Sequence, residues 1–61
     1  MKKIRLMLVD DHEVVRVGLK TFLQTQPDFE VVSEANNGEA AIERAMETHP
    51  DVILIDRTSV V

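Results

Sequence analysis

Two short apolar runs, one near each end of the chain, dominate the pattern of hydrophobic and polar positions. Residues 4–9 are apolar on both alternating faces except at Arg5, which is typical of a strand buried in a parallel sheet. Residues 52–55 form a second run of the same kind. Residues 29–35 alternate only in part, with β-branched residues at their centre, and predict a third strand that lies nearer an edge of the sheet.

Helical periodicity fills the first gap between these runs. Between residues 13 and 25 the apolar positions follow the i, i+4, i+7, i+8 spacing of an amphipathic helix. These positions are Val15, Leu19, Phe22 and Leu23. Gly18 lowers the helical propensity of this segment, so we expect a close packing contact at that residue. The Gln26-Pro27-Asp28 segment ends the helix.

A second helix is predicted to end near Thr48, before His49-Pro50. Asn36 is its expected N-cap and Glu39, three residues on, completes a weak capping box. Four alanines and several glutamates give the segment a high helical propensity. Its predicted apolar side consists of Ala41, Ile42, Ala45 and Met46.

The predicted order is therefore β-α-β-α-β, an α/β arrangement of three strands and two helices. Right-handed crossovers turn such an order into a parallel sheet. With 61 residues and no cysteine, the chain forms at most one small domain without disulfides or a Cys/His zinc site. Its stability must come from apolar packing, a bound ion or a second chain.

Carboxylates follow both of the buried strands. Asp10 and Asp11 come directly after the first strand, and Asp56 ends the last one. Because the carboxyl ends of parallel strands meet at one edge of a sheet, we expect the three acids to lie close together. A divalent cation relieves their repulsion, and Mg²⁺ with one or two carboxylates is suited to phosphoryl transfer. The alternative is that Asp10 and Asp11 only cap a helix and Asp56 only ends a strand.

Other candidate residues carry weaker signals. His12 is either a base or metal ligand or, as we expect, an exposed residue at a helix start. His49 suits the negative end of the second helix, and Met7 and Met46 are expected to fill the core. No glycine-rich phosphate loop occurs, and Gly38 is expected to be a turn glycine.

Charge and hydropathy exclude two classes of partner for this segment. A net charge of −4 argues against direct nucleic-acid binding, which needs a clustered basic face. The apolar run after Lys2 and Lys3 is too short and too interrupted for a signal peptide, and no run approaches the length of a membrane span. We expect a cytoplasmic protein.

Three stretches of the sequence form a recognisable set: LVDDHEVVRVGL at residues 8–19, VVSEANNGEAA at residues 31–41 and PDVILID at residues 50–56. Together they resemble the receiver domain of bacterial two-component response regulators. The D-D-H-x-x-V-R-x-G-L form is similar to the NarL/FixJ-like subfamily, whose receivers precede a LuxR-type helix-turn-helix domain. The resemblance implies a flavodoxin-like (CheY-like) fold, truncated here to residues 1–56, and a parent protein that binds DNA and regulates transcription.

The resemblance also implies roles for individual residues. Asp56 would be the phospho-acceptor, receiving a phosphoryl group from the phosphohistidine of a sensor histidine kinase in a phosphorelay. Asp10 and Asp11, together with Asp56, would hold Mg²⁺, and the backbone carbonyl of Thr58 would supply a further ligand. On this interpretation the chain is a signalling phosphoprotein rather than an enzyme.

The sequence departs from the family after Asp56. Residues 57–61 form an atypical tail, and the Ser/Thr of a fourth strand and the Lys of a fifth strand are missing. The strand at 52–55 would then be an uncovered edge, so we expect a homodimer or larger assembly through it. Two hypotheses stay open: a working phospho-acceptor, or a truncated, switch-incompetent fragment that self-associates as an interaction module. A phosphohydrolase with Asp56 as nucleophile is a weaker third.

Overall fold

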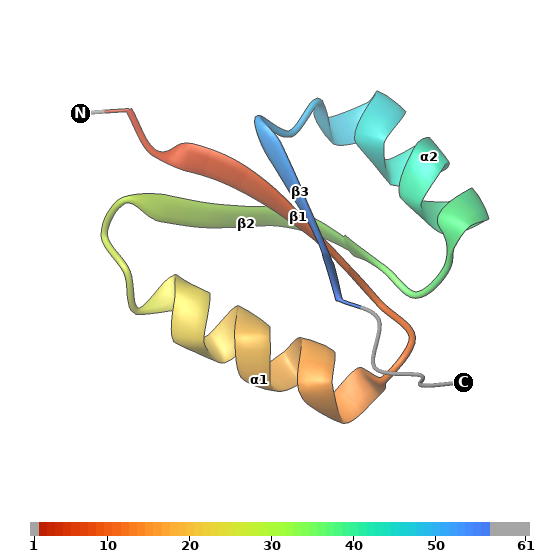
Figure 1. Cartoon of the computed structure of the whole chain (residues 1–61). Helices are drawn as coiled ribbons and strands as arrows, with labels where there is room; N and C mark the ends of the chain where they lie inside the picture. Colours follow the sequence, from red (N-terminus) through yellow and green to blue (C-terminus); the bar gives the residue numbers. More distant parts are fainter. Residues whose placement is uncertain (1, 57–61) are drawn as a thin grey trace.

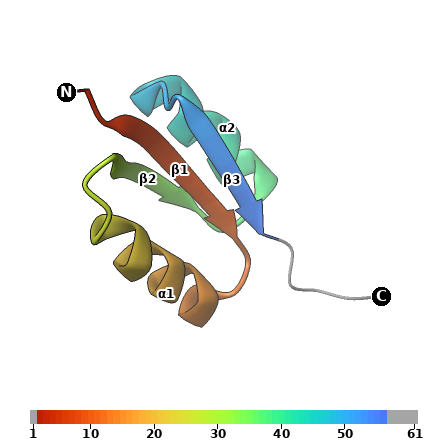
Figure 2. The same ribbon diagram turned by 60° about the vertical axis from the view of Figure 1, so that its left-hand side comes forward.

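The fold is a three-stranded parallel sheet with one helix on each face (Figure 1). The structure, a computed structural model, describes residues 2–56. In chain order the elements are β1 (Ile4–Asp10), α1 (Glu13–Gln24), β2 (Phe29–Ala35), α2 (Gly38–Thr48) and β3 (Val52–Asp56). The strand order is β2-β1-β3, so β1 is central, as Figure 2 also shows. This confirms the predicted β-α-β-α-β parallel sheet.

Strand β1 forms the centre of the core because both of its faces are covered. Leu6 and Leu8 are buried on the α1 face with Leu23, and Met7 is fully buried. Val31 of β2 also packs against this core. A bulge in the β1–β2 pairing follows Leu6. Continuous apolar sequence in a central parallel strand thus has the expected packing on both sides.

Helix α1 packs on the sheet through fewer residues than its periodicity predicts. Val15 and Leu19 are half-buried and Leu23 is buried, as expected. Phe22, however, is 62% exposed, because successive helical residues are turned by about 100° and Leu23 is the one that points at β1. The close contact expected at Gly18 is also wrong, since a Cβ there would meet no atom within 4 Å.

Helix α2 begins one residue later than the sequence suggested. The N-cap is Asn37, whose Oδ1 accepts a hydrogen bond from the Ala40 N–H at 2.8 Å. Asn36 instead accepts a bond from the Asn37 side chain, so the predicted Asn36–Glu39 capping box is wrong. Asn37 has the extended backbone of an N-cap and stands three residues before Ala40, the spacing that this bond needs.

The apolar side of α2 is only partly covered. Ala41 and Ala45 are half-buried, whereas Ile42 and Met46 are 65% and 71% exposed. Their exposure overturns the expectation that Met46 fills the core, although Met7 does. The sheet in the described part of the chain has three strands, and α2 lies closest to β2 and β1, so one edge of the helix's apolar side extends past the covered surface.

Arg5 fastens the C-terminal end of α2 to the start of β1. Its guanidinium donates to the carbonyl oxygens of Thr48 and His49, the latter at 2.8 Å, and so satisfies carbonyls that a helix end leaves without partners. His49 ends the helix in the left-handed conformation, with φ 49°. Asp51 exchanges bonds with the Arg5 backbone, through its carboxylate at 2.9 Å and its N–H at 2.8 Å.

Strand β3 is paired on one edge, with β1. Its apolar residues are all exposed, from 39% at Leu54 to 67% at Ile55. In the same range of residues, no helix has the length and apolar character needed to cross a bilayer.

Candidate metal centre

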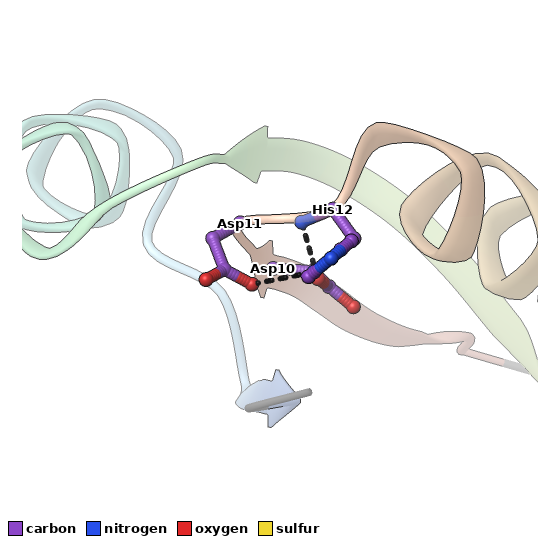
Figure 3. A group of neighbouring side chains, drawn as sticks. All are labelled: Asp10, Asp11 and His12. Carbon is purple, nitrogen blue, oxygen red and sulfur yellow. Dashed lines mark hydrogen bonds and ion pairs between the residues drawn. The ribbon is translucent and has the colours of Figure 1, made fainter. Parts of the chain in front are cut away.

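The candidate site lies at the carboxyl ends of β1 and β3. Asp10 is the last residue of β1 and is paired in register with Asp56, the last residue of β3. Neighbouring strands are about 4.8 Å apart, so the two backbones are adjacent at this edge of the sheet. Asp11 and His12 follow Asp10 in the turn that leads to α1 (Figure 3). We call Asp10, Asp11 and His12 the acidic turn.

Asp10 is the buried acid of the acidic turn. It is 2% exposed, and its Oδ1 accepts a hydrogen bond from the His12 N–H at 2.7 Å. Its Oδ2 is also buried, but no residue in the described range donates a hydrogen bond to it. A buried carboxylate oxygen without a donor is unfavourable by several kcal/mol unless it meets a cation or another donor. This oxygen therefore has the chemistry of a ligand position.

Asp11 and His12 form the exposed side of the acidic turn. The Asp11 Oδ1 lies 3.2 Å from the His12 Nδ1, and both side chains are more than half exposed. One possible ligand atom from each of Asp10, Asp11 and His12 lies within 4.8 Å of the others. Mg²⁺ prefers the oxygen ligands of the two carboxylates, whereas an imidazole ligand suits transition metals.

His12 lies where the sequence placed it, exposed at the start of α1. It is the N-cap residue, but its side chain accepts no capping bond. Asp10 therefore bonds the N–H of the N-cap residue itself and not an N–H of the first helical turn. The purely capping interpretation of Asp10 does not explain its second, buried oxygen.

A network of opposite charges stands behind the acidic turn. Arg16 donates through Nη1 to the Asp10 carbonyl oxygen at 2.9 Å and through Nε to the Glu34 Oε1 at 3.2 Å. Lys20 lies 2.7 Å from the other Glu34 oxygen. The hydrogen bond from Lys20 is the main reason that the pKa of Glu34 lies below its ordinary value of 4.5; partial burial opposes this and Arg16 adds to it.

Sequence reasoning missed this network. The only available signal was the spacing of Arg16 and Lys20, four residues apart on one helix, which puts both on the same face. Their partner, Glu34, lies on another element and has no sequence pattern that marks it.

Two of the predicted site residues are described less fully. The backbone of Asp56 lies beside Asp10, as expected from the meeting of the two strand ends. Thr58, whose carbonyl is the expected further ligand, lies outside the described residues, as does the rest of the tail at 57–61. The end of β1 at Asp10 and the end of β3 at Asp56 thus meet, and the ligand roles of Asp10, Asp11, Asp56 and Thr58 stay predictions.

Comparison with known proteins identifies the family to which the chain belongs. Residues 6–58 match the response regulator receiver domain family. The chain is 55% identical over 53 residues to the transcriptional regulatory protein LiaR of Bacillus subtilis, a match that covers 87% of this chain and 25% of LiaR. It is 51% identical over 53 residues to the response regulator proteins VraR of Staphylococcus saprophyticus and Staphylococcus aureus, with the same two coverages.

The chain spans about a quarter of the length of the curated relatives it matches. Response regulators receive a phosphoryl group from sensor histidine kinases, and their receiver domains bind Mg²⁺ at an acidic site and are generally not enzymes. The family match spans the strands β1 to β3 almost completely and includes the whole acidic turn. The chain belongs to the response regulator receiver domain family of two-component systems.

Proposed function

We propose that this chain accepts a phosphoryl group on Asp56, with Mg²⁺ held by Asp10 and Asp11. Asp56 and the Thr58 backbone carbonyl complete the proposed ligand set. One observation carries the proposal: Asp10 presents a buried carboxylate oxygen that has no donor among the described residues, directly beside the end of β3. The family match supports the identity of the acceptor, because residue 56 falls inside the matched range.

The proposed reaction is a phosphoryl transfer from a phosphohistidine of a sensor histidine kinase. An Asp56 carboxylate oxygen forms a bond to phosphorus while the phosphorus–nitrogen bond breaks, and the imidazole nitrogen leaves with the bonding electron pair. Bound Mg²⁺ supplies neutralisation of the charge on the phosphoryl oxygens. Asp10, already fixed by the His12 N–H, contributes an oxygen that needs no reorientation before the metal binds.

The test is the intact mass of the chain after incubation with acetyl phosphate and Mg²⁺. We expect one added phosphoryl group on the wild type, and none with EDTA, on Asp56→Asn or on Asp10→Asn. Asp28→Asn is the matched control, because Asp28 is exposed and distant in sequence from the acidic turn. Absence of the adduct from folded wild-type protein, or its persistence in Asp56→Asn, would contradict the proposal. Continuous release of phosphate without an adduct would favour the phosphohydrolase hypothesis instead.

A second function, self-association, has its own supporting observation. Every apolar residue of β3 is at least 39% exposed, and an exposed apolar edge strand favours pairing with another chain. We propose that two copies pair through this edge in solution. Sedimentation should show a dimer for the wild type and a monomer for Ile53→Lys, while Val14→Lys, a change at an equally apolar exposed residue of α1, stays dimeric. A wild type that stays monomeric at high concentration excludes this function.

The remaining proposals concern the division of the chain into segments and the role of the protein in the cell. We propose that residues 1–56 act as a partial receiver and residues 57–61 as a separate tail. The printed name of the Bacillus subtilis relative describes a transcriptional regulator, and on that basis we propose that the parent protein regulates transcription through a DNA-binding domain and acts in the cytoplasm. We further propose that this chain is a signalling module and not an enzyme.

A further inference from the structure

Arg16 joins the acidic turn to the edge strand β2. Its Nη1 donates to the Asp10 carbonyl oxygen at 2.9 Å and its Nε donates to the Glu34 Oε1 at 3.2 Å. The side chain is only 17% exposed, and Glu34 is held from its other oxygen by Lys20 at 2.7 Å. The planar guanidinium is therefore held at Nη1 by the backbone of β1 and at Nε by Glu34, which Lys20 also holds.

The contact at Asp10 is to the backbone and not to the carboxylate. Because the peptide unit is planar, a bond that fixes the Asp10 carbonyl also fixes the plane of the Asp10–Asp11 peptide. A second restraint, the hydrogen bond from the His12 N–H to the Asp10 Oδ1, fixes the Asp10 side chain. Together the two bonds determine the direction of the remaining oxygen, Asp10 Oδ2.

We propose that Arg16 is a positioning residue for the metal site, holding the Asp10–Asp11 peptide in place while Glu34 orients and partly neutralises its guanidinium. This inference rests on the proposed function. It runs against simple electrostatics, because a cation behind two carboxylates weakens the binding of a second cation. The two effects of Arg16 therefore have opposite signs, and their balance is measurable.

The first test measures Mg²⁺ affinity. The readout is the amide chemical shifts of the acidic turn during a titration with Mg²⁺ alone. We expect Arg16→Met to weaken binding about tenfold, as is typical for loss of a group that orients a ligand. Arg44→Met is the matched control, because the Arg44 side chain is exposed and its one ion pair among the described residues is the 3.6 Å pair with Glu47. Tighter binding in Arg16→Met would show that the charge of Arg16 outweighs any positioning effect, and unchanged binding would show no net positioning effect; either result would overturn the inference.

A double substitution separates orientation of Arg16 from the charge of Glu34. Glu34→Gln should weaken Mg²⁺ binding in the wild-type background and have little further effect in the Arg16→Met background, since residues of one network are not additive. Equal effects in both backgrounds would mean that Glu34 acts by its charge alone, and would contradict its proposed role.

A measurement without metal separates failure of this inference from failure of the proposed function. In metal-free protein, Arg16→Met and Glu34→Gln should each speed hydrogen exchange at the His12 N–H by about threefold or more. The Ala41 N–H, bonded to the Asn37 carbonyl in α2, is the internal reference and should not change. Equal exchange at His12 in all three proteins overturns the positioning role. If both variants exchange faster at His12 but the wild type binds no Mg²⁺, the positioning role stands and only the proposed function is refuted.

Discussion

The two ends of strand β1 use polar residues in opposite ways. At its beginning, the Arg5 side chain donates hydrogen bonds to the last carbonyls of α2. The backbone N–H of Arg5 donates to the Asp51 carboxylate, and the Arg5 carbonyl accepts from the Asp51 N–H. At its end, Asp10 is more deeply buried, yet one of its carboxylate oxygens has no donor within the described residues. The polar groups of Arg5 thus have hydrogen-bond partners, whereas one carboxylate oxygen of Asp10 has no donor among the described residues.

One strand of seven residues thus carries a polar residue that serves folding at one end and a polar residue that suits a binding site at the other. A helix end needs donors for its carbonyls, and Arg5 supplies them, so that end is explained by folding alone. Burial of an acid without a full set of donors opposes folding, and such strain is typical of binding sites. The contrast predicts that substitutions at the two ends change stability in opposite directions.

The largest effect is expected at the Arg5 end. Arg5→Met removes charge-assisted bonds to two helix-terminal carbonyls and should lower the free energy of unfolding by about 2 kcal/mol. Mg²⁺ affinity should not change, since this end of β1 is remote from the acidic turn. Chemical denaturation gives the stability, and Arg44→Met serves as control. A loss of less than about 0.5 kcal/mol would place Arg5 among ordinary surface residues.

A smaller effect of opposite sign is expected at the other end. Asp10→Asn keeps an oxygen for the His12 N–H and removes a buried charge next to Asp11, so in Mg²⁺-free solution it should raise the free energy of unfolding by about 1 kcal/mol. Asp28→Asn, at an exposed site, should stay near the wild type. If Asp10→Asn destabilises the protein as Arg5→Met does, the two ends of β1 do not differ in kind.

The smallest effect concerns the charge network behind the acidic turn. Because the pKa of Glu34 is lower in the folded than in the unfolded chain, its stabilisation is fully present above the ordinary value of 4.5 and is lost as the pH falls through the folded value. Glu34→Gln should therefore destabilise the protein by under about 1 kcal/mol near pH 7, and the difference should vanish at lower pH. A difference that is constant from pH 7 to pH 3 would show that the loss is not electrostatic.

The sequence predicts the elements because hydrophobic periodicity depends on local geometry alone. All three strands and both helices occur in the predicted order, although α2 begins one residue later than predicted, and β1 and β3 bring the backbones of Asp10 and Asp56 together. Which apolar residues of a helix are covered depends instead on how far the sheet extends. Met46 is exposed for that reason, although it continues an apolar stripe.

The site was predictable in its location and not in its detail. Strand ends locate Asp10 and Asp11, but only the packing shows that one is buried and its neighbour exposed. The sequence pattern placed the cap of α2 at Asn36, whereas the extended backbone and the bond from the Ala40 N–H place it at Asn37. Arg16 and Glu34 are 18 residues apart, and contacts across elements at such a distance follow no local rule.

The most direct test of the metal site is the stability of the wild type and of Asp10→Asn in Mg²⁺ and in NaCl of equal ionic strength. A ligand that binds only the folded state at 100 times its dissociation constant adds about 2.7 kcal/mol. We expect Mg²⁺ to stabilise the wild type toward this value and to leave Asp10→Asn unchanged, so that the order of their stabilities reverses when the metal is added. Equal stabilisation of both proteins, or of neither, would contradict the assignment of Asp10 as a metal ligand.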